Sequence, residues 1–186
     1  MSVFNESPTY LRQRLFHRGR KFNFDVHSLR LHNGVEGDWE CIRHRGGALA
    51  VLITSKGELV LVKQYRFAVR GRLLEFPAGT LKPNEEALET IKHEIQEETG
   101  YCANTWHSLG KLSLAPGYSD EYIYVFLARD LEKLDHPPKQ DKEERTEVVL
   151  MTFSEFETAL LKGEPIDAKS LSSFLMTRLF LDKING

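Results

Sequence analysis

Residues 79–101, GTLKPNEEALETIKHEIQEETGY, concentrate carboxylates in a way that could support chemistry. They contain six glutamates, and a helix turns by about 100° per residue, so Glu94 and Glu98 point to one side with Glu97 beside them. Like charges four residues apart repel, and partly buried carboxylates are costly to ionise. A divalent cation such as Mg²⁺ or Mn²⁺ would offset both costs, because these ions prefer carboxylate oxygens.

Helix formation alone explains only part of this pattern. Asn84 is expected to cap the helix, which would place three glutamates near the positive end of its dipole, namely Glu85, Glu86 and Glu89. The expected apolar stripe consists of Leu88, Ile91 and Ile95. Glu98 lies at the edge of that stripe, where a carboxylate needs a partner. The alternative is a solvated acidic helix that pairs with lysines elsewhere in the chain.

The spacing of these residues resembles the Nudix box, the signature of a family of hydrolases. Gly79 is followed by five residues and Glu85, and seven further residues lead to HEIQEETGY, residues 93–101. The fixed positions of the box match except for its arginine, which is His93 here. That arginine orients the box by pairing with a glutamate. Histidine is shorter and lacks the forked geometry of a guanidinium, so the substitution is expected to affect catalytic strength.

The resemblance extends to the branch of ADP-ribose pyrophosphatases and nucleoside diphosphate sugar hydrolases. Residues 61–86 carry QYR followed by LE-x-PAG, and Pro116 follows Tyr101 by fifteen residues. The implied reaction is divalent-metal-dependent hydrolysis of the pyrophosphate of ADP-ribose, GDP-mannose or another nucleoside diphosphate sugar. One alternative is a Nudix hydrolase for a dinucleotide or a nucleoside triphosphate, and another is a catalytically weak domain that senses ADP-ribose.

The resemblance also implies roles for individual residues. The carbonyl of Ala78 would bind metal together with three carboxylates that also serve catalysis, namely Glu94, Glu97 and Glu98. Glu121 is preferred over its neighbour Asp120 as general base. The fallback candidates for that base lie in a later charged loop, namely Glu143 and Glu144.

Four further residues are candidates for substrate binding. Arg66, in QYR, would contact the pyrophosphate or the terminal ribose, because a guanidinium forks onto phosphate oxygens. Glu75 would bind a ribose hydroxyl or support Arg66. Arg45 is a weaker candidate for the diphosphate, and Tyr118 is a candidate for stacking on the base.

The elements expected to position these residues alternate between strands and helices. Strands are predicted at residues 12–17, 21–31, 39–44, 48–54, 59–67, 72–76, 106–114, 122–128 and 146–151. Helices are predicted over the glutamate-rich stretch and at 154–162 and 169–183, the last with a core face formed by Leu171, Phe174, Leu175 and Leu179. The predicted class is α/β (α+β), and the resemblance specifies a Nudix fold with a mixed sheet between helices. The resemblance further implies that residues 1–44 form an antiparallel β appendage, through which such enzymes make homodimers, and that residues 45–186 form the hydrolase domain.

Composition narrows the class of protein. The chain has 186 residues, a net charge of −2 and a pI near 6.4, so nucleic acid is not expected as a partner, because phosphate binding needs concentrated Lys and Arg. No apolar run is long enough to span a bilayer. The two cysteines, Cys41 and Cys102, form no disulfide or zinc pattern. A cytoplasmic protein is expected.

Overall fold

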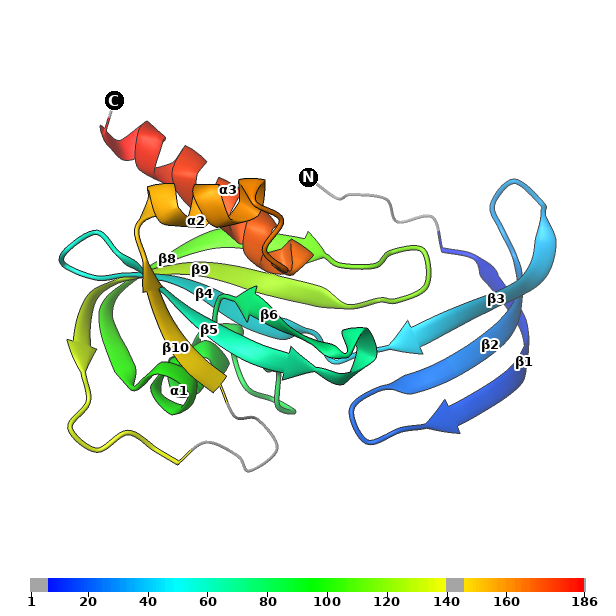
Figure 1. Cartoon of the computed structure of the whole chain (residues 1–186). Helices are drawn as coiled ribbons and strands as arrows, with labels where there is room; N and C mark the ends of the chain where they lie inside the picture. The colour runs from blue at the N-terminus through cyan, green and yellow to red at the C-terminus, as the bar shows by residue number, and fades with distance from the viewer. Residues whose placement is uncertain (1–6, 140–145, 186) are drawn as a thin grey trace. The chain divides into compact units, whose positions relative to one another are not determined.

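The computed structural model describes residues 7–139 and 146–185, and the chain divides into two compact units (Figure 1). The N-terminal unit comprises residues 1–45 with 113–121. The larger unit comprises residues 46–112 with 122–186. The fallback general bases Glu143 and Glu144 lie outside the described residues.

The N-terminal unit is built on a three-stranded antiparallel sheet. Its strands are β1 (Thr9–Arg18), β2 (Asn23–Arg30) and β3 (Glu36–Arg43), in the order β1-β2-β3. Every residue of β1 is exposed, and only Asp25 and Leu29 are buried among the residues of the three strands. The predicted antiparallel β appendage is confirmed, and it carries little hydrophobic core of its own.

The larger unit is built on a seven-stranded mixed sheet with the central order β10-β5-β4-β9-β8. Strand β4 runs parallel to β9 but antiparallel to β5, and β5 is antiparallel to β10. Two short strands extend this arrangement, because β6 pairs with β5 and β7 pairs with β4. The bounds are β4 Gly47–Ile53, β5 Leu59–Arg66, β6 Gly71–Glu75, β7 Ala78–Thr80, β8 Tyr101–Ser113, β9 Tyr122–Lys133 and β10 Thr146–Met151.

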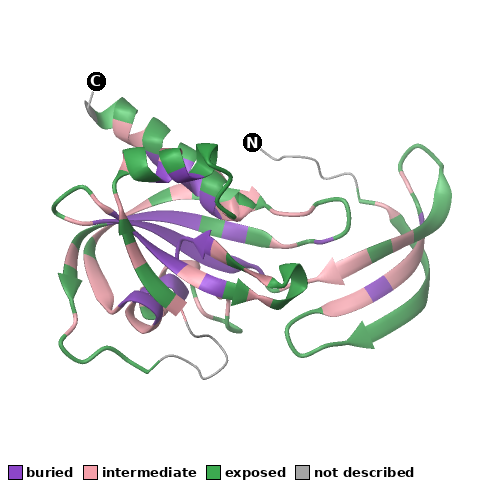
Figure 2. Cartoon of the chain, in the orientation of Figure 1, coloured by how far each residue is buried: buried purple, intermediate pink, exposed green. Residues whose placement is uncertain are grey.

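Helices cover both faces of this sheet (Figure 1), namely α1 (Ala87–Thr99), α2 (Phe153–Leu161) and α3 (Ala168–Asn185). Alternate residues of a strand point to opposite faces, and Ala48, Ala50 and Leu52 of β4 share a buried cluster with Ile91 and Ile95 of α1. On the side of α2 and α3, three aromatic rings pack in sequence, namely Phe76, Phe156 and Phe174. Figure 2 shows the burial concentrated in the central strands. The predicted α+β class, with a mixed sheet between helices, is confirmed.

Two helix details differ from the predictions. Asn84 does not cap α1: it has a φ of 61°, in a turn, and the helix begins after Glu86. In α3, Phe174 is buried, but the other predicted core residues are exposed, namely Leu171, Leu175 and Leu179. The buried side of α3 instead carries small hydroxyl residues, namely Ser170, Ser173 and Thr177. Side chains of this size let a helix approach the sheet closely, which hydrophobic periodicity does not reveal.

Candidate active site

The glutamate-rich helix α1 packs directly on the short strand β7 that precedes it. Glu98 is only 6% exposed, and its carboxylate accepts a hydrogen bond from the backbone N–H of Ala78 at 3.1 Å. Glu94, one turn earlier, lies against Gly79 so closely that an added Cβ there would be 2.2 Å from its carboxyl carbon. Glu97 lies on the same helix and is half-buried. The structure therefore brings Ala78, Gly79, Glu94 and Glu98 together.

Two further box positions are Gly100, at the end of α1, and His93, within the helix. Gly100 has a φ of 73° and donates its N–H to the carbonyl of Gln96 at 3.1 Å, which ends α1 in the conformation that glycine adopts most easily. His93 occupies the position of the family's arginine, and its Nδ1 lies 3.4 Å from Glu85 Oε1. Glu85 also accepts a hydrogen bond from the Thr90 hydroxyl at 2.9 Å. His93 is therefore close to Glu85 through a single ring nitrogen.

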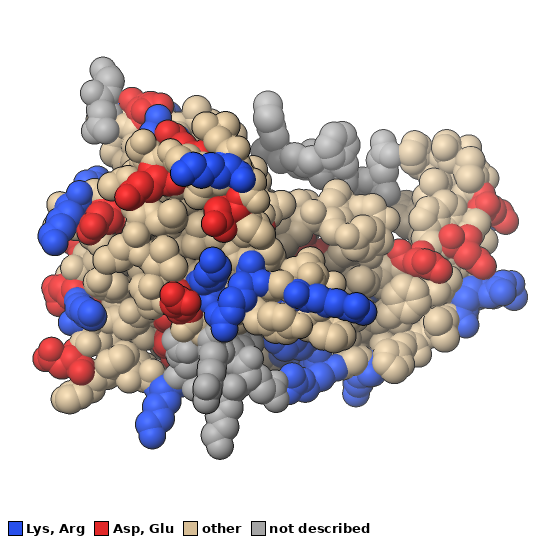
Figure 3. All heavy atoms as spheres, in the orientation of Figure 1, with Lys and Arg blue, Asp and Glu red and all other residues tan. Residues whose placement is uncertain are grey.

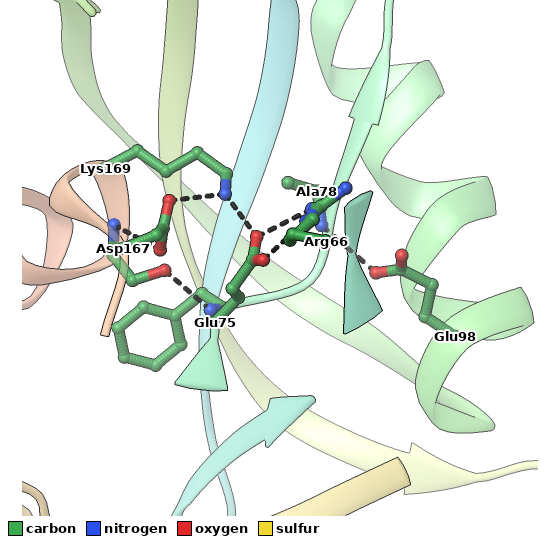
Figure 4. A network of polar contacts seen from close by, with 8 residues as sticks. Arg66, Glu75, Ala78, Glu98, Asp167 and Lys169 are labelled. Atoms are coloured by element: carbon green, nitrogen blue, oxygen red, sulfur yellow. Dashed lines mark hydrogen bonds and ion pairs between the residues drawn. The ribbon is translucent and has the colours of Figure 1, made fainter. Parts of the chain in front are cut away.

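A second cluster surrounds the side chain of Glu75, which is only 1% exposed (Figure 4). Arg66 donates to both carboxylate oxygens, from Nε at 2.6 Å and from Nη2 at 2.7 Å. Lys169 Nζ pairs with the same carboxylate and with Asp167. Burial alone would raise the pKa of Glu75, but hydrogen bonds and charge from Arg66 and Lys169 bring it below the ordinary value. Glu75 is therefore held as an anion inside the larger unit.

The two clusters influence each other electrostatically. The hydrogen bonds to Glu75 raise the pKa of Arg66, and the charges of Glu98 and Asp167 raise it further. Arg66 thus lies within electrostatic range of the carboxylate on the box helix. Arg66 thereby places a cation beside these carboxylates, and a phosphate-bearing substrate needs such a cation to bind its oxygens.

Glu121, the predicted general base, belongs to the N-terminal unit. Its Oε1 lies 3.2 Å from His44 Nδ1, and both side chains are largely shielded from solvent. The neighbouring Asp120 is engaged differently, because it accepts from the His44 backbone N–H at 2.8 Å and pairs with Arg43 at 3.2 Å. Asp120 therefore ties the loop to the end of β3.

Arg45 and Tyr118 also belong to the N-terminal unit, and both are exposed. The backbone carbonyl of Tyr118 accepts from the Ile42 N–H at 2.8 Å, which joins its loop to β3. Arg45 lines a groove of about 500 Å³ whose other lining residues are Arg18, Gly19, Arg20, Lys21, Phe22, Asn23, Arg43 and His44. Among residues 7–139 and 146–185, no carboxylate lines this groove, so the surface that these residues give it is cationic.

Sequence reasoning missed Lys169, Asp167 and His44 as neighbours of candidate residues. Lys169 is 94 positions from Glu75, and His44 is 77 positions from Glu121, as the difference of their numbers. In the sequence, His44 has no metal-ligand spacing that would single it out. An isolated Asp-Ala-Lys at the start of a helix is equally unspecific as a signal, because side chains of this kind are common at exposed helix ends.

The chemistry of the donors in the box suits a hard divalent cation. Among residues 7–139 and 146–185, no three His, Cys, Asp or Glu side chains form a ready-made metal cluster. Mg²⁺ does not require one, because it keeps several waters and binds through one or two carboxylates together with substrate phosphates. Glu94 and Glu98, both beside Ala78 and Gly79 of β7, provide carboxylates of this kind.

Charged side chains of both signs occur on the face of the larger unit that is seen in Figure 3. Within the part of the chain that the structure describes, no helix is both long and apolar enough to cross a membrane. Cys41 and Cys102 are free thiols.

Comparisons with known proteins agree with this fold and identify the family. The family model described as NUDIX domain matches residues 43–174. An ADP-ribose pyrophosphatase of Bacillus subtilis is 31% identical, over 89% of each chain. A methanol dehydrogenase activator of Bacillus methanolicus is 29% identical, over 92% of each chain. The solved structure of an ADP compounds hydrolase superposes with a TM-score of 0.82 at 25% identity, over 98% of each chain.

Proposed function

The chain belongs to the NUDIX domain family of hydrolases, and from this premise we propose that it hydrolyses the pyrophosphate of ADP-ribose and of related nucleoside diphosphate sugars. The observation that carries the proposal is the packing of Glu94 and Glu98 on Ala78 and Gly79 at the start of β7. The names of the B. subtilis relative and of the superposed structure, ADP-ribose pyrophosphatase and ADP compounds hydrolase, support this class of substrate.

In the proposed reaction, a water oxygen attacks one phosphorus and the bridging P–O bond breaks. For ADP-ribose the products are AMP and ribose 5-phosphate. Arg66 would hold a phosphate oxygen, and Glu75 would keep the Arg66 guanidinium in place. We keep Glu121 as the proposed general base, because it faces His44 whereas Asp120 is engaged in holding its loop. Arg45 and Tyr118 remain proposed contacts for the diphosphate and the base.

The carboxylates of Glu94, Glu97 and Glu98 and the carbonyl of Ala78 are the groups that would hold Mg²⁺ or Mn²⁺. A bound ion of this type neutralises phosphate charge and polarises the phosphoryl oxygen. The buried environment of Glu98 favours such a role, since a low-dielectric site strengthens its attraction for a cation.

The proposal also includes a cytoplasmic homodimer. Strand β1 exposes four large apolar side chains, namely Tyr10, Leu11, Leu15 and Phe16. A three-stranded sheet with so little core is expected to be covered by a partner, and a second copy of this sheet is the simplest partner. Residues 1–44 are accordingly proposed as the dimerisation element and 45–186 as the hydrolase domain. The two free thiols are consistent with a reducing compartment.

The test of the proposed function is release of nucleoside monophosphate from ADP-ribose, GDP-mannose, other nucleoside diphosphate sugars, NADH and a nucleoside triphosphate. Each is assayed with Mg²⁺ and with Mn²⁺, for the wild type, Glu97→Gln and Glu98→Gln. Turnover of nucleoside diphosphate sugars that requires metal and falls at least ~10²-fold in both variants is expected. Absence of turnover for every substrate, with ADP-ribose still bound, would refute the proposal.

A further inference from the structure

We propose that Lys169 is a positioning residue that acts through Glu75 to orient the substrate-binding guanidinium of Arg66. This inference rests on the proposed function in one respect, because it takes Arg66 to bind the phosphates of the substrate. It concerns a residue at the start of α3, outside the box and outside the QYR and LE-x-PAG segments.

The charges around Glu75 favour a positioning role for Lys169. A carboxylate with 1% exposure needs cationic partners to remain ionised. Arg66, with a side chain 38% exposed, is one partner, and Lys169, 12% exposed, is the second. Arg66 therefore spans from the buried carboxylate toward solvent, whereas Lys169 belongs to the interior. This is the distribution expected if Lys169 stabilises the anion and Arg66 faces the substrate.

The Arg66 guanidinium has more N–H donors than its contact with Glu75 uses. A guanidinium has five N–H donors, and the two bonds to Glu75 use two of them. The bidentate contact fixes the plane of the guanidinium, so the remaining donors are directed before any substrate arrives. Displacement of the Glu75 carboxylate would therefore rotate the group that binds phosphate.

The contact between Lys169 and Glu75 is one of three that join residues 74–76 to the segment 165–170. Leu74, Glu75 and Phe76 are consecutive, and each is held by the segment 165–170. The Leu74 N–H donates to the Pro165 carbonyl at 2.9 Å, and the Phe76 N–H donates to the Ser170 hydroxyl at 2.8 Å. Lys169 pairs with Glu75 between them. The segment 165–170, which leads into α3, thus holds the end of β6 at Glu75, three residues before Ala78.

Asp167 completes the arrangement by holding Lys169 itself. Its carboxylate pairs with Lys169 Nζ and also accepts the Ser170 backbone N–H at 3.2 Å. Lys169 is therefore fixed between two carboxylates from different parts of the chain, Glu75 and Asp167. A lysine restrained in this way acts as a rigid link rather than as a mobile surface charge.

The test compares the kinetics of Lys169→Met, Lys169→Arg and Asp167→Asn with those of the wild type. The matched control is Lys183→Met, an exposed lysine of the same helix. Lys169→Met is expected to raise KM for ADP-ribose about tenfold and to change kcat by less than about threefold, because one charge-assisted hydrogen bond to the anchor of Arg66 is lost. Lys169→Arg should restore most of the loss, and Asp167→Asn should give a smaller rise in KM.

A second readout separates this inference from the proposed function. The Nε–H signal of Arg66 in a ¹H–¹⁵N NMR spectrum, assigned by its disappearance in Arg66→Lys, reports the Arg66–Glu75 bond without any turnover. It should shift in Lys169→Met and Asp167→Asn but not in Lys183→Met. An unchanged signal and unchanged KM in folded Asp167→Asn and Lys169→Met would overturn the role of Lys169. A shifted signal with no turnover of ADP-ribose by the wild type would refute the proposed function alone.

Discussion

The carboxyl group of Glu94 occupies the space that a side chain on Gly79 would need. An ideal Cβ at Gly79 would lie 2.2 Å from the Cγ, the Cδ and the Oε1 atom of Glu94, a separation that real Cβ atoms do not tolerate. The first glycine of the box is therefore required by close approach of the helix, and φ at this position is not unusual. The spacing of the box and the packing of Glu94 thus both require glycine at position 79.

Gly79→Ala should displace Glu94 and lower activity by at least ~10²-fold, because a shift of about 1 Å in a catalytic group has an effect of that size. The added methyl should also lower the free energy of unfolding by about 1–3 kcal/mol. Steady-state kinetics and urea denaturation measure the two effects. Gly71→Ala is the control, since its new Cβ would meet only Val69 O, at 3.6 Å. Equal behaviour of the two variants would contradict the packing argument.

His93→Arg should strengthen the contact with Glu85, because a guanidinium can donate through two N–H groups where His93 Nδ1 lies 3.4 Å away. The pair is partly exposed, so the gain in unfolding free energy is expected to be only about 0.2–1 kcal/mol. We expect kcat/KM to rise by up to about fivefold, the equivalent of that energy. Thermal denaturation and kinetics of His93→Arg and His93→Ala measure it, and a lower kcat/KM in His93→Arg would show that histidine has a role of its own.

The depressed pKa of Glu75 predicts a stability that depends on acidic pH. A group whose pKa is lower in the folded state contributes stability that is fully present above its unfolded value, here 4.5, and is lost as pH falls through the folded value. Glu75→Gln leaves Arg66 without its anion and Lys169 with Asp167 as its remaining carboxylate partner, so at pH 7 it should be about 3–5 kcal/mol less stable than the wild type.

Urea denaturation of the wild type and Glu75→Gln at pH 7, 5, 4 and 3 tests this expectation. The difference in unfolding free energy should be constant from pH 7 to 5 and should shrink below about 4.5. Glu155→Gln provides a comparison at an exposed capping carboxylate, whose pKa is lowered by the hydrogen bonds from the Thr152 N–H and hydroxyl. A Glu75→Gln difference that stays constant down to pH 3 would show that its ionisation does not stabilise the fold.

Leu15→Glu should convert the proposed homodimer into a monomer, because it places a charge within the exposed apolar side chains of β1. Light scattering should give about twice 21.4 kDa for the wild type and 21.4 kDa for the variant. Val35→Glu is the matched control, since Val35 is also exposed in the N-terminal unit but lies outside its strands. A monomeric wild type, or a Leu15→Glu variant that remains dimeric, would contradict an interface formed by β1.

The box could be predicted from sequence because its constraints are local. Glu94 and Glu98 are one helical turn apart, so the helical repeat alone places them on one side. Glu98 was predicted at the edge of the apolar stripe, and it is buried there beside Ile91 and Ile95. The N-cap was predicted wrongly, because Asn84 suits both a helix cap and a left-handed turn, and the turn is what forms.

The sequence predicts that Glu75 either supports Arg66 or binds a ribose hydroxyl. The other contacts of Glu75 could not be predicted from sequence. Lys169 reaches Glu75 only because α3 packs across the end of β6. The same packing buries Ser170, Ser173 and Thr177 and leaves Leu171, Leu175 and Leu179 exposed. The family, the box helix and the carboxylates that it presents can be predicted from sequence, because they depend on residues within a few turns of one another. The distant cation that holds the buried anion is visible only in the folded chain, because its choice depends on how separate elements pack.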